Sequence, residues 1–86
     1  MLNINVYTLV KTNGYDIETL IETTSKEKAL NTLKTDFANA IPKNWTDECK
    51  NMSELTQNKA ILYANNEDVF VWKLLTTSIS GGNNYD

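Results

Sequence analysis

The sequence predicts an α+β fold in which one main helix packs on one face of a four-stranded, mostly antiparallel sheet, in the order ββ-α-(α)-ββ. Two stretches, Asn5 to Glu22 and Lys59 onward, alternate apolar with polar residues or are rich in β-branched and aromatic ones, as strands are. Between them, apolar residues recur every three or four positions, as in an amphipathic helix. The chain of 86 residues has the length of one domain, which we place at residues 1–80, with residues 81–86 as a flexible tail.

The stretch "LVKTNGYDIETL" (residues 9–20) predicts the first hairpin. Asn13 and Gly14 both accept positive φ, as a two-residue hairpin turn requires, and this turn places Thr12 opposite Tyr15. One face of the ribbon then carries Val6, Thr8, Val10, Ile17, Thr19 and Ile21, and the other carries Asn5, Tyr7, Leu9, Lys11, Asp16, Glu18, Leu20 and Glu22. We expect the first face, which is rich in β-branched residues, to be the buried one.

Residues 24–41 predict the main helix. Its apolar stripe consists of Leu30, Leu33, Phe37 and Ile41, widened by Ala29 and Ala40. Thr24 and Glu27 have the spacing of a capping box, and Pro42 ends the segment because it disfavours helical geometry at the residue before it.

Residues 45–55 predict a short second helix whose apolar face carries Trp45, Cys49, Met52 and Leu55. Asp47 and Glu48 fall in its first turn, where the helix dipole favours carboxylates. The segments "KAILYA" and "VFVWKLLTTS" predict the last hairpin. Pairing Ala64 with Val69 places Ile61, Tyr63, Phe70 and Trp72 on one face, which we expect to pack under the main helix.

Composition argues against several functional classes. The formal charge of −3 and the absence of Arg disfavour direct binding of nucleic acid, and the absence of His removes the commonest general base and metal ligand. Cys49 is the only cysteine, so we expect a small buried hydrophobe rather than a nucleophile or disulfide. The Asp47-Glu48 and Glu67-Asp68 pairs lack the spacing of a calcium loop. We therefore expect no enzymatic activity, no metal and no cofactor.

The sequence also predicts a cytoplasmic location without membrane contact. The longest apolar run, "VFVWKLL", is far shorter than the roughly 20 residues of a membrane helix. The amino-terminal stretch "MLNINVYTLV" has no basic region and alternates apolar with polar residues, unlike a signal peptide.

A single helical layer covers one face of a sheet. By this register the other face carries Tyr7, Leu9, Leu20, Leu62 and Val71. Exposed apolar groups of this kind usually mark an interface, so we expect a protein partner or a homodimer through this face or an edge strand. Tyr7, Leu9 and Leu20 would be anchors, and a row of Asp16, Glu18 and Glu22 would supply charge complementarity or imitate phosphates. The alternative is that residues 45–55 fold back and cover this face.

In size, acidic charge, lack of Arg and ββ-α-ββ plan, residues 1–80 resemble small accessory proteins of phages and mobile elements. These include anti-CRISPR and other anti-defence inhibitors. The resemblance implies a non-enzymatic binding protein in a bacterial host cell that blocks a macromolecular partner, such as a CRISPR nuclease or another defence protein. The alternative is a self-associating structural module, or an immunity or antitoxin-like module, without an inhibitory role.

Overall fold

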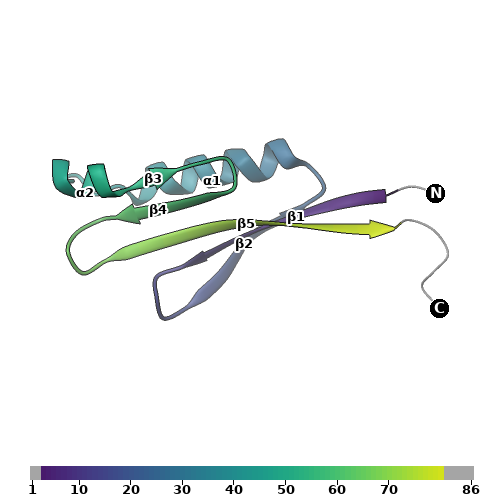
Figure 1. Ribbon diagram of the computed structural model, residues 1–86, viewed down its shortest axis with the longest axis horizontal. Helices are drawn as coiled ribbons and strands as arrows, with labels where there is room; N and C mark the ends of the chain where they lie inside the picture. The colour runs from purple at the N-terminus through teal and green to yellow at the C-terminus, as the bar shows by residue number, and fades with distance from the viewer. Residues whose placement is uncertain (1–2, 81–86) are drawn as a thin grey trace.

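Within residues 3–80, which the computed structural model describes, the chain forms five strands and two helices (Figure 1). The elements are β1 (Asn3–Thr12), β2 (Ile17–Thr23), α1 (Lys26–Ala40), α2 (Asp47–Met52), β3 (Glu54–Leu55), β4 (Lys59–Tyr63) and β5 (Val69–Ser80). The antiparallel sheet has the order β2-β1-β5-β4-β3. The predicted α+β class is confirmed, but the sheet has five strands rather than four, because Glu54 and Leu55 pair with β4. The predicted tail, residues 81–86, lies outside the described residues.

The first hairpin has a four-residue loop, Asn13–Asp16, because Thr12 pairs with Ile17. The Oδ1 atom of Asn13 accepts hydrogen bonds from the backbone N–H groups of Tyr15 and Asp16, each at 2.9 Å. Gly14 has a φ of 97°, which an L side chain rarely adopts. The two-residue turn predicted from Asn13 and Gly14 is therefore wrong, since the Asn13 side chain stabilises a longer loop.

A bulge in β2 changes which of its residues face the helix. Val10 pairs with Thr19, but Leu9 pairs with Ile21, so Leu20 is an extra residue opposite β1. An inserted residue interrupts the strict alternation of faces along a strand. Ile21 consequently packs against the core, as predicted, although it lies opposite Leu9 rather than Val6.

Helix α1 begins one residue later than the predicted capping box. The hydroxyl of Ser25, not that of Thr24, caps it by accepting the backbone N–H of Lys28 at 3.1 Å. The Thr23 hydroxyl accepts the N–H of Ser25 at 3.1 Å in the turn that leaves β2, so the chain enters the helix only at Lys26. The predicted stripe is confirmed in Ala29, Leu33 and Phe37, which are buried.

Helix α2 is shorter than the predicted segment 45–55. Thr46 caps it by accepting the N–H of Cys49 at 3.1 Å, and its backbone becomes extended at Ser53. The Ser53 hydroxyl accepts the N–H of Tyr63 at 2.9 Å, which ties the end of α2 to β4 and starts β3. Neither helix of the described part has the length and apolar character to span a bilayer.

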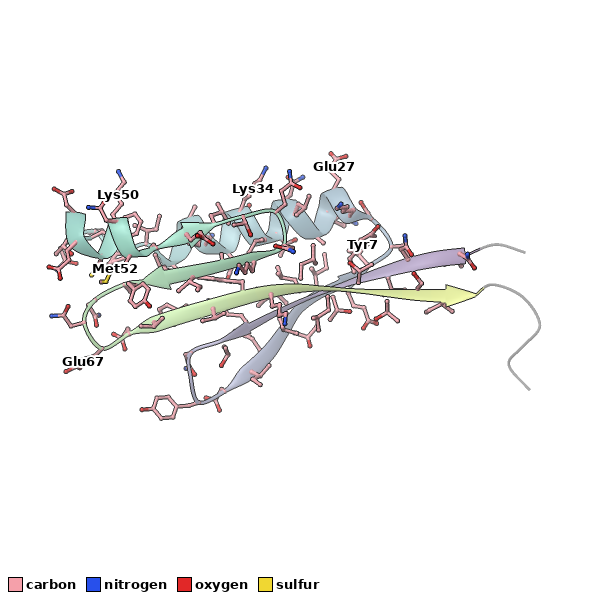
Figure 2. All side chains as sticks on the ribbon, in the orientation of Figure 1. Tyr7, Glu27, Lys34, Lys50, Met52 and Glu67 are labelled. Atoms are coloured by element: carbon pink, nitrogen blue, oxygen red, sulfur yellow. The ribbon has the colours of Figure 1, made fainter. Side chains whose placement is uncertain are left out.

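The hydrophobic core lies between α1 and one face of the sheet. Its buried members are Leu9, Ala29, Leu33, Phe37, Ala60, Leu62, Trp72 and Leu74. Trp72 is completely buried, and its ring centroid lies 5.5 Å from that of Phe37. The face of the first hairpin predicted to be buried is thus wrong, because α1 covers the side of β1 that carries Tyr7 and Leu9 (Figure 2). Phe70 and Trp72 of β5 do pack under α1, as predicted.

The strands β1 and β5 continue beyond the core as a two-stranded arm, which we define as Asn3–Val6 and Thr77–Ser80. In Figure 1 this arm projects past the start of α1. Strand β2 pairs with β1 only as far as Tyr7, and β4 pairs with β5 only as far as Lys73. The molecule is accordingly elongated, with extents of 53 × 24 × 16 Å.

Candidate protein-binding face

The side of the sheet opposite α1, which we name the uncovered face, is the candidate functional surface. Side chains alternate between the two faces of a strand, so its members follow from the register with the buried Leu9 and Trp72. They are Ile4, Val6, Thr8, Val10 and Thr12 on β1, Ile17, Thr19 and Glu22 on β2, Lys59, Ile61 and Tyr63 on β4, and Val69, Val71, Lys73, Leu75, Thr77 and Ile79 on β5.

Four apolar side chains on this face form one group at the arm: Ile4, Val6, Leu75 and Ile79. Ile4 lies directly opposite Ile79, and Val6 lies opposite Thr77, between Leu75 and Ile79. Ile4, Leu75 and Ile79 are 45%, 43% and 37% exposed, respectively. A contiguous exposed apolar group is a common mark of a protein-binding surface. We call these four residues the arm group.

Two lysines lie beside the arm group. Lys59 and Lys73 are directly opposite each other on β4 and β5, and both are exposed. Like charges at opposed strand positions destabilise a sheet. Within residues 3–80 neither lysine has a carboxylate within ion-pair distance. A partner that places a carboxylate between them would relieve this repulsion.

The predicted anchors lie on the other side of the sheet. Leu9 is completely buried in the core, which excludes it as a contact residue in this structure. Tyr7 and Leu20 are half-buried and pack against the core. The prediction placed them on the wrong face because it took the β-branched side of the first ribbon for the buried one. The register before the bulge differs by two residues from the predicted one, which leaves the faces of β1 unchanged. The segment 45–55 does not cover them either, since α1 does.

The predicted acidic row is also wrong as a row, although Asp16, Glu18 and Glu22 are all exposed. Asp16 lies in the hairpin loop, Glu18 is opposite Lys11, and Glu22 is opposite Thr8. Lys11 and Thr8 are three residues apart on β1 and therefore lie on opposite faces. The bulge at Leu20 thus separates Glu18 from Glu22, and Glu22 alone belongs to the uncovered face.

A partly buried polar contact holds α1 onto the sheet. Trp72 Nε1 donates a hydrogen bond of 2.8 Å to Asp36 Oδ2, and Lys11 Nζ lies 3.0 Å from the same oxygen. Lys11 Nζ also lies 5.2 Å from the ring centroids of both Phe70 and Trp72. These groups contact one another and explain the docking of the helix.

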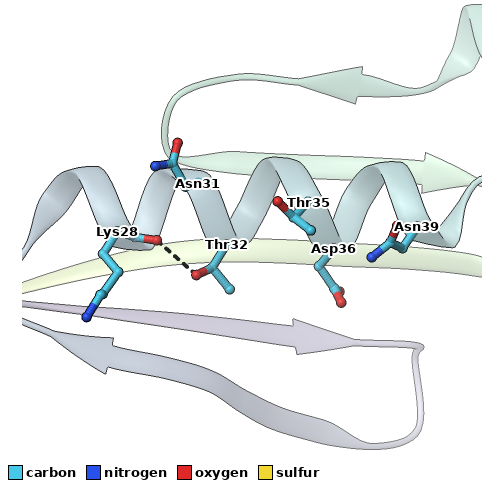
Figure 3. Close-up of a pocket in the computed structure, with 6 residues that line it drawn as sticks. All are labelled: Lys28, Asn31, Thr32, Thr35, Asp36 and Asn39. Carbon is cyan, nitrogen blue, oxygen red and sulfur yellow. Dashed lines mark hydrogen bonds between the residues drawn. The ribbon is translucent and has the colours of Figure 1, made fainter.

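The remaining candidates for chemistry, Cys49 and a groove on α1, have structural roles. Cys49 is 3% exposed and packs in the first turns of α2. A shallow groove runs along one flank of α1 (Figure 3), lined by Lys28, Asn31, Thr32, Thr35, Asp36 and Asn39. The Thr32 hydroxyl in it donates to the carbonyl of Lys28 at 2.9 Å, a local helix contact. Within the described residues, Cys, Asp and Glu side chains do not gather in groups of three or more that could hold a metal ion.

Comparison with known proteins adds no relative: no family model, curated protein or solved structure matches the chain. The assignment of the uncovered face as a candidate binding surface therefore depends on the geometry of the face alone. One sequence signal could have revealed the arm. The predicted partner "KAILYA" is much shorter than "VFVWKLLTTS", so the far end of the longer strand must extend beyond this hairpin.

Proposed function

We propose that the protein is a small non-enzymatic binding protein that blocks a host macromolecular partner by protein–protein contact through its uncovered face. The observation that carries the proposal is the exposed arm group beside the unpaired Lys59 and Lys73. An apolar patch supplies binding free energy, and a pair of charges at its border supplies orientation and association rate.

The arm group alone supports modest affinity. Burying a whole Leu or Ile side chain contributes about 1.5–3 kcal/mol. Ile4, Leu75 and Ile79 are each about two-fifths exposed, so each has about 0.6–1.2 kcal/mol left to gain on binding. Tight binding therefore requires the neighbouring part of the uncovered face as well, including Val10 and Val71.

The proposed class of partner is a bacterial defence protein such as a CRISPR nuclease. The acidic, Arg-free composition and small size support this class, as in the phage-encoded inhibitors that the chain resembles. The contact surface differs from the one the sequence indicated. It consists of the uncovered face, and its partner would present an apolar surface with carboxylates facing Lys59 and Lys73.

The test is a phage plating assay in bacteria that carry an active CRISPR system, followed by titration of the purified nuclease. We expect the wild-type protein to restore plating and to inhibit the nuclease at stoichiometric concentration. The double variant Lys59→Glu/Lys73→Glu should weaken inhibition by about tenfold or more, because it reverses the charge that a partner would contact.

The matched control is Lys34→Glu/Lys50→Glu. Lys34 on α1 and Lys50 on α2 point away from the sheet (Figure 2), and their reversal changes the net charge by the same amount. This control should inhibit like the wild type. Equal loss in both variants would mean that net charge, not the uncovered face, decides binding. Absence of inhibition by the wild-type protein in every system tested would contradict the proposed class of partner.

A further inference from the structure

The free edge of β5 beyond β4 has its backbone hydrogen-bonding groups directed outward. The backbone N–H of Leu74 donates to the carbonyl of Asn58 at 2.8 Å, on the β4 side of the strand. Hydrogen-bonding direction alternates along a strand, so the N–H and C=O groups of Thr76 and Ser78 point the same way. Among the described strands none pairs with β5 on this side after Lys73.

This edge lacks the features that usually protect an edge strand. Residues 75–79 carry no charge and no proline, and the pairing of β5 with β1 runs without a bulge. Natural proteins use charges, prolines, bulges or very short strands to prevent pairing at an edge. The outer strands of the same sheet do so, because β2 has a bulge and two glutamates, and β3 has two residues.

We propose that a second copy of this chain pairs with this edge, β5 against β5, about a two-fold axis at Thr77. The segment is complementary to itself in this register. Thr76 of one copy lies opposite Ser78 of the other, so the outward-facing N–H and C=O groups of both residues are satisfied in each copy. The pairing ends at Leu75, because Asn58 already lies opposite Leu74 and its carbonyl accepts the Leu74 N–H. Leu75 of one copy lies opposite Ile79 of the other on the uncovered face.

The same pairing explains the long arm. A two-stranded ribbon is at best marginally stable in water, and strands usually have about five or six residues, whereas β5 has 12. Pairing converts the two arms into a four-stranded sheet in the order β1-β5-β5-β1. The two arm groups, each of Ile4, Val6, Leu75 and Ile79, then form one continuous apolar surface. A strand from an unrelated protein would satisfy the backbone but would not provide this two-fold match of side chains.

The first test is disulfide trapping in a Cys49→Ala background. Across the proposed axis, Thr77 faces its own copy as a non-hydrogen-bonded pair, with Cα atoms about 4.5 Å apart. This distance lies within the range for a disulfide, about 4.4–6.8 Å. Thr77→Cys should therefore form a covalent dimer under mild oxidation. Ser78→Cys should not, because Ser78 faces Thr76 and its own copy is displaced by two residues.

The second test uses proline and sedimentation velocity over a range of protein concentrations. The N–H of Ser78 points to the free edge, so Ser78→Pro leaves the pairing of β5 with β1 intact but removes hydrogen bonds across the proposed interface. We expect its dimer dissociation constant to rise about tenfold or more. Ser78→Ala, which loses only the hydroxyl bond of 2.8 Å to Asn5 Oδ1, should still dimerise.

A wild-type chain that stays monomeric up to about millimolar concentration would overturn this inference, even if the edge took a strand from another protein. So would a dimer that Ser78→Pro leaves unchanged, or equal trapping of the Thr77→Cys and Ser78→Cys variants. The inference does not rest on the proposed function, because pairing at the β5 edge leaves Lys59 and Lys73 accessible to a partner.

Discussion

Replacing Leu9 with alanine tests directly which face of the sheet is the core. Leu9 has no exposed surface, and it lies opposite Leu74 and Ile21, both of which contact the core. Truncation of a fully buried leucine costs about 3–5 kcal/mol, since the transfer free energy is lost and a cavity remains. An 86-residue domain has a total stability of about 4–13 kcal/mol. We therefore expect Leu9→Ala to remove a large fraction of it.

The matched control is Leu75→Ala. Leu75 is the same residue type on the uncovered face and is 43% exposed, so its truncation leaves no closed cavity and should cost about 1 kcal/mol. Urea unfolding followed by tryptophan fluorescence measures both, because Trp72 is completely buried in the folded chain. With a urea dependence of about 1–3 kcal/mol per molar, Leu9→Ala should lower the midpoint by about 1–5 M.

The measurement requires a protein concentration at which sedimentation shows only monomer, so that Leu75 does not report on dimer formation. Equal midpoint shifts for the two variants, or a larger shift for Leu75→Ala, would refute the assignment of the faces. A change in the slope of the transition would indicate a change in the surface exposed on unfolding and would exclude a simple comparison.

Three further substitutions test local features. Asp36→Ala should lower the free energy of unfolding by about 1–3 kcal/mol, because it leaves the Trp72 indole N–H without its acceptor. Asp36→Asn keeps an acceptor and should cost less than half as much. Equal losses for the two variants would assign the effect to the ion pair with Lys11 instead. Ser25→Ala should lower the free energy of unfolding by about 0.5–2 kcal/mol and Thr24→Ala by less than about 0.5 kcal/mol; the reverse order in thermal melts would place the cap at Thr24. Gly14→Ala should cost about 1 kcal/mol, entirely from its φ of 97°, since a Cβ there meets nothing within 4 Å; an unchanged melting temperature would contradict this.

Local patterns in the sequence predicted α1 well and the register of the hairpins poorly. The stripe through Leu33 and Phe37 depends only on the helical period, and Pro42 ends the helix by sterics within the chain. A hairpin register depends instead on loop length, which a single side chain can change. Asn13 lengthens the first loop by accepting two backbone N–H groups, and Asn65 does the same in the second by accepting those of Glu67 and Asp68.

The second hairpin shows that an error of one residue in the register changes which side chains share a face. The predicted pair Ala64 and Val69 becomes Tyr63 opposite Val69, and each later partner is displaced by one. Phe70 therefore lies opposite Leu62 rather than Tyr63, on the side that α1 covers. A displacement of one residue exchanges the faces of a strand relative to its neighbour, so the predicted grouping of Ile61 with Trp72 is wrong.

The choice of the buried face follows from the shape of side chains rather than from their hydropathy alone. The covered side of the strands carries Leu9, Leu62, Phe70, Trp72 and Leu74, whereas the uncovered face is mostly Val, Ile and Thr. Large flexible or aromatic side chains reach across to a helix and fill the space beneath it. β-Branched side chains stabilise an extended backbone even when they are half-exposed. The β-branched face of the first ribbon was therefore evidence for strands, and it was not evidence for a core. Leu75 does not follow this rule. Its side chain is not branched at Cβ, yet it lies 43% exposed among β-branched neighbours. That departure falls next to the free edge of β5, at the position where pairing with a second copy would place Leu75 beside Ile79 of that copy.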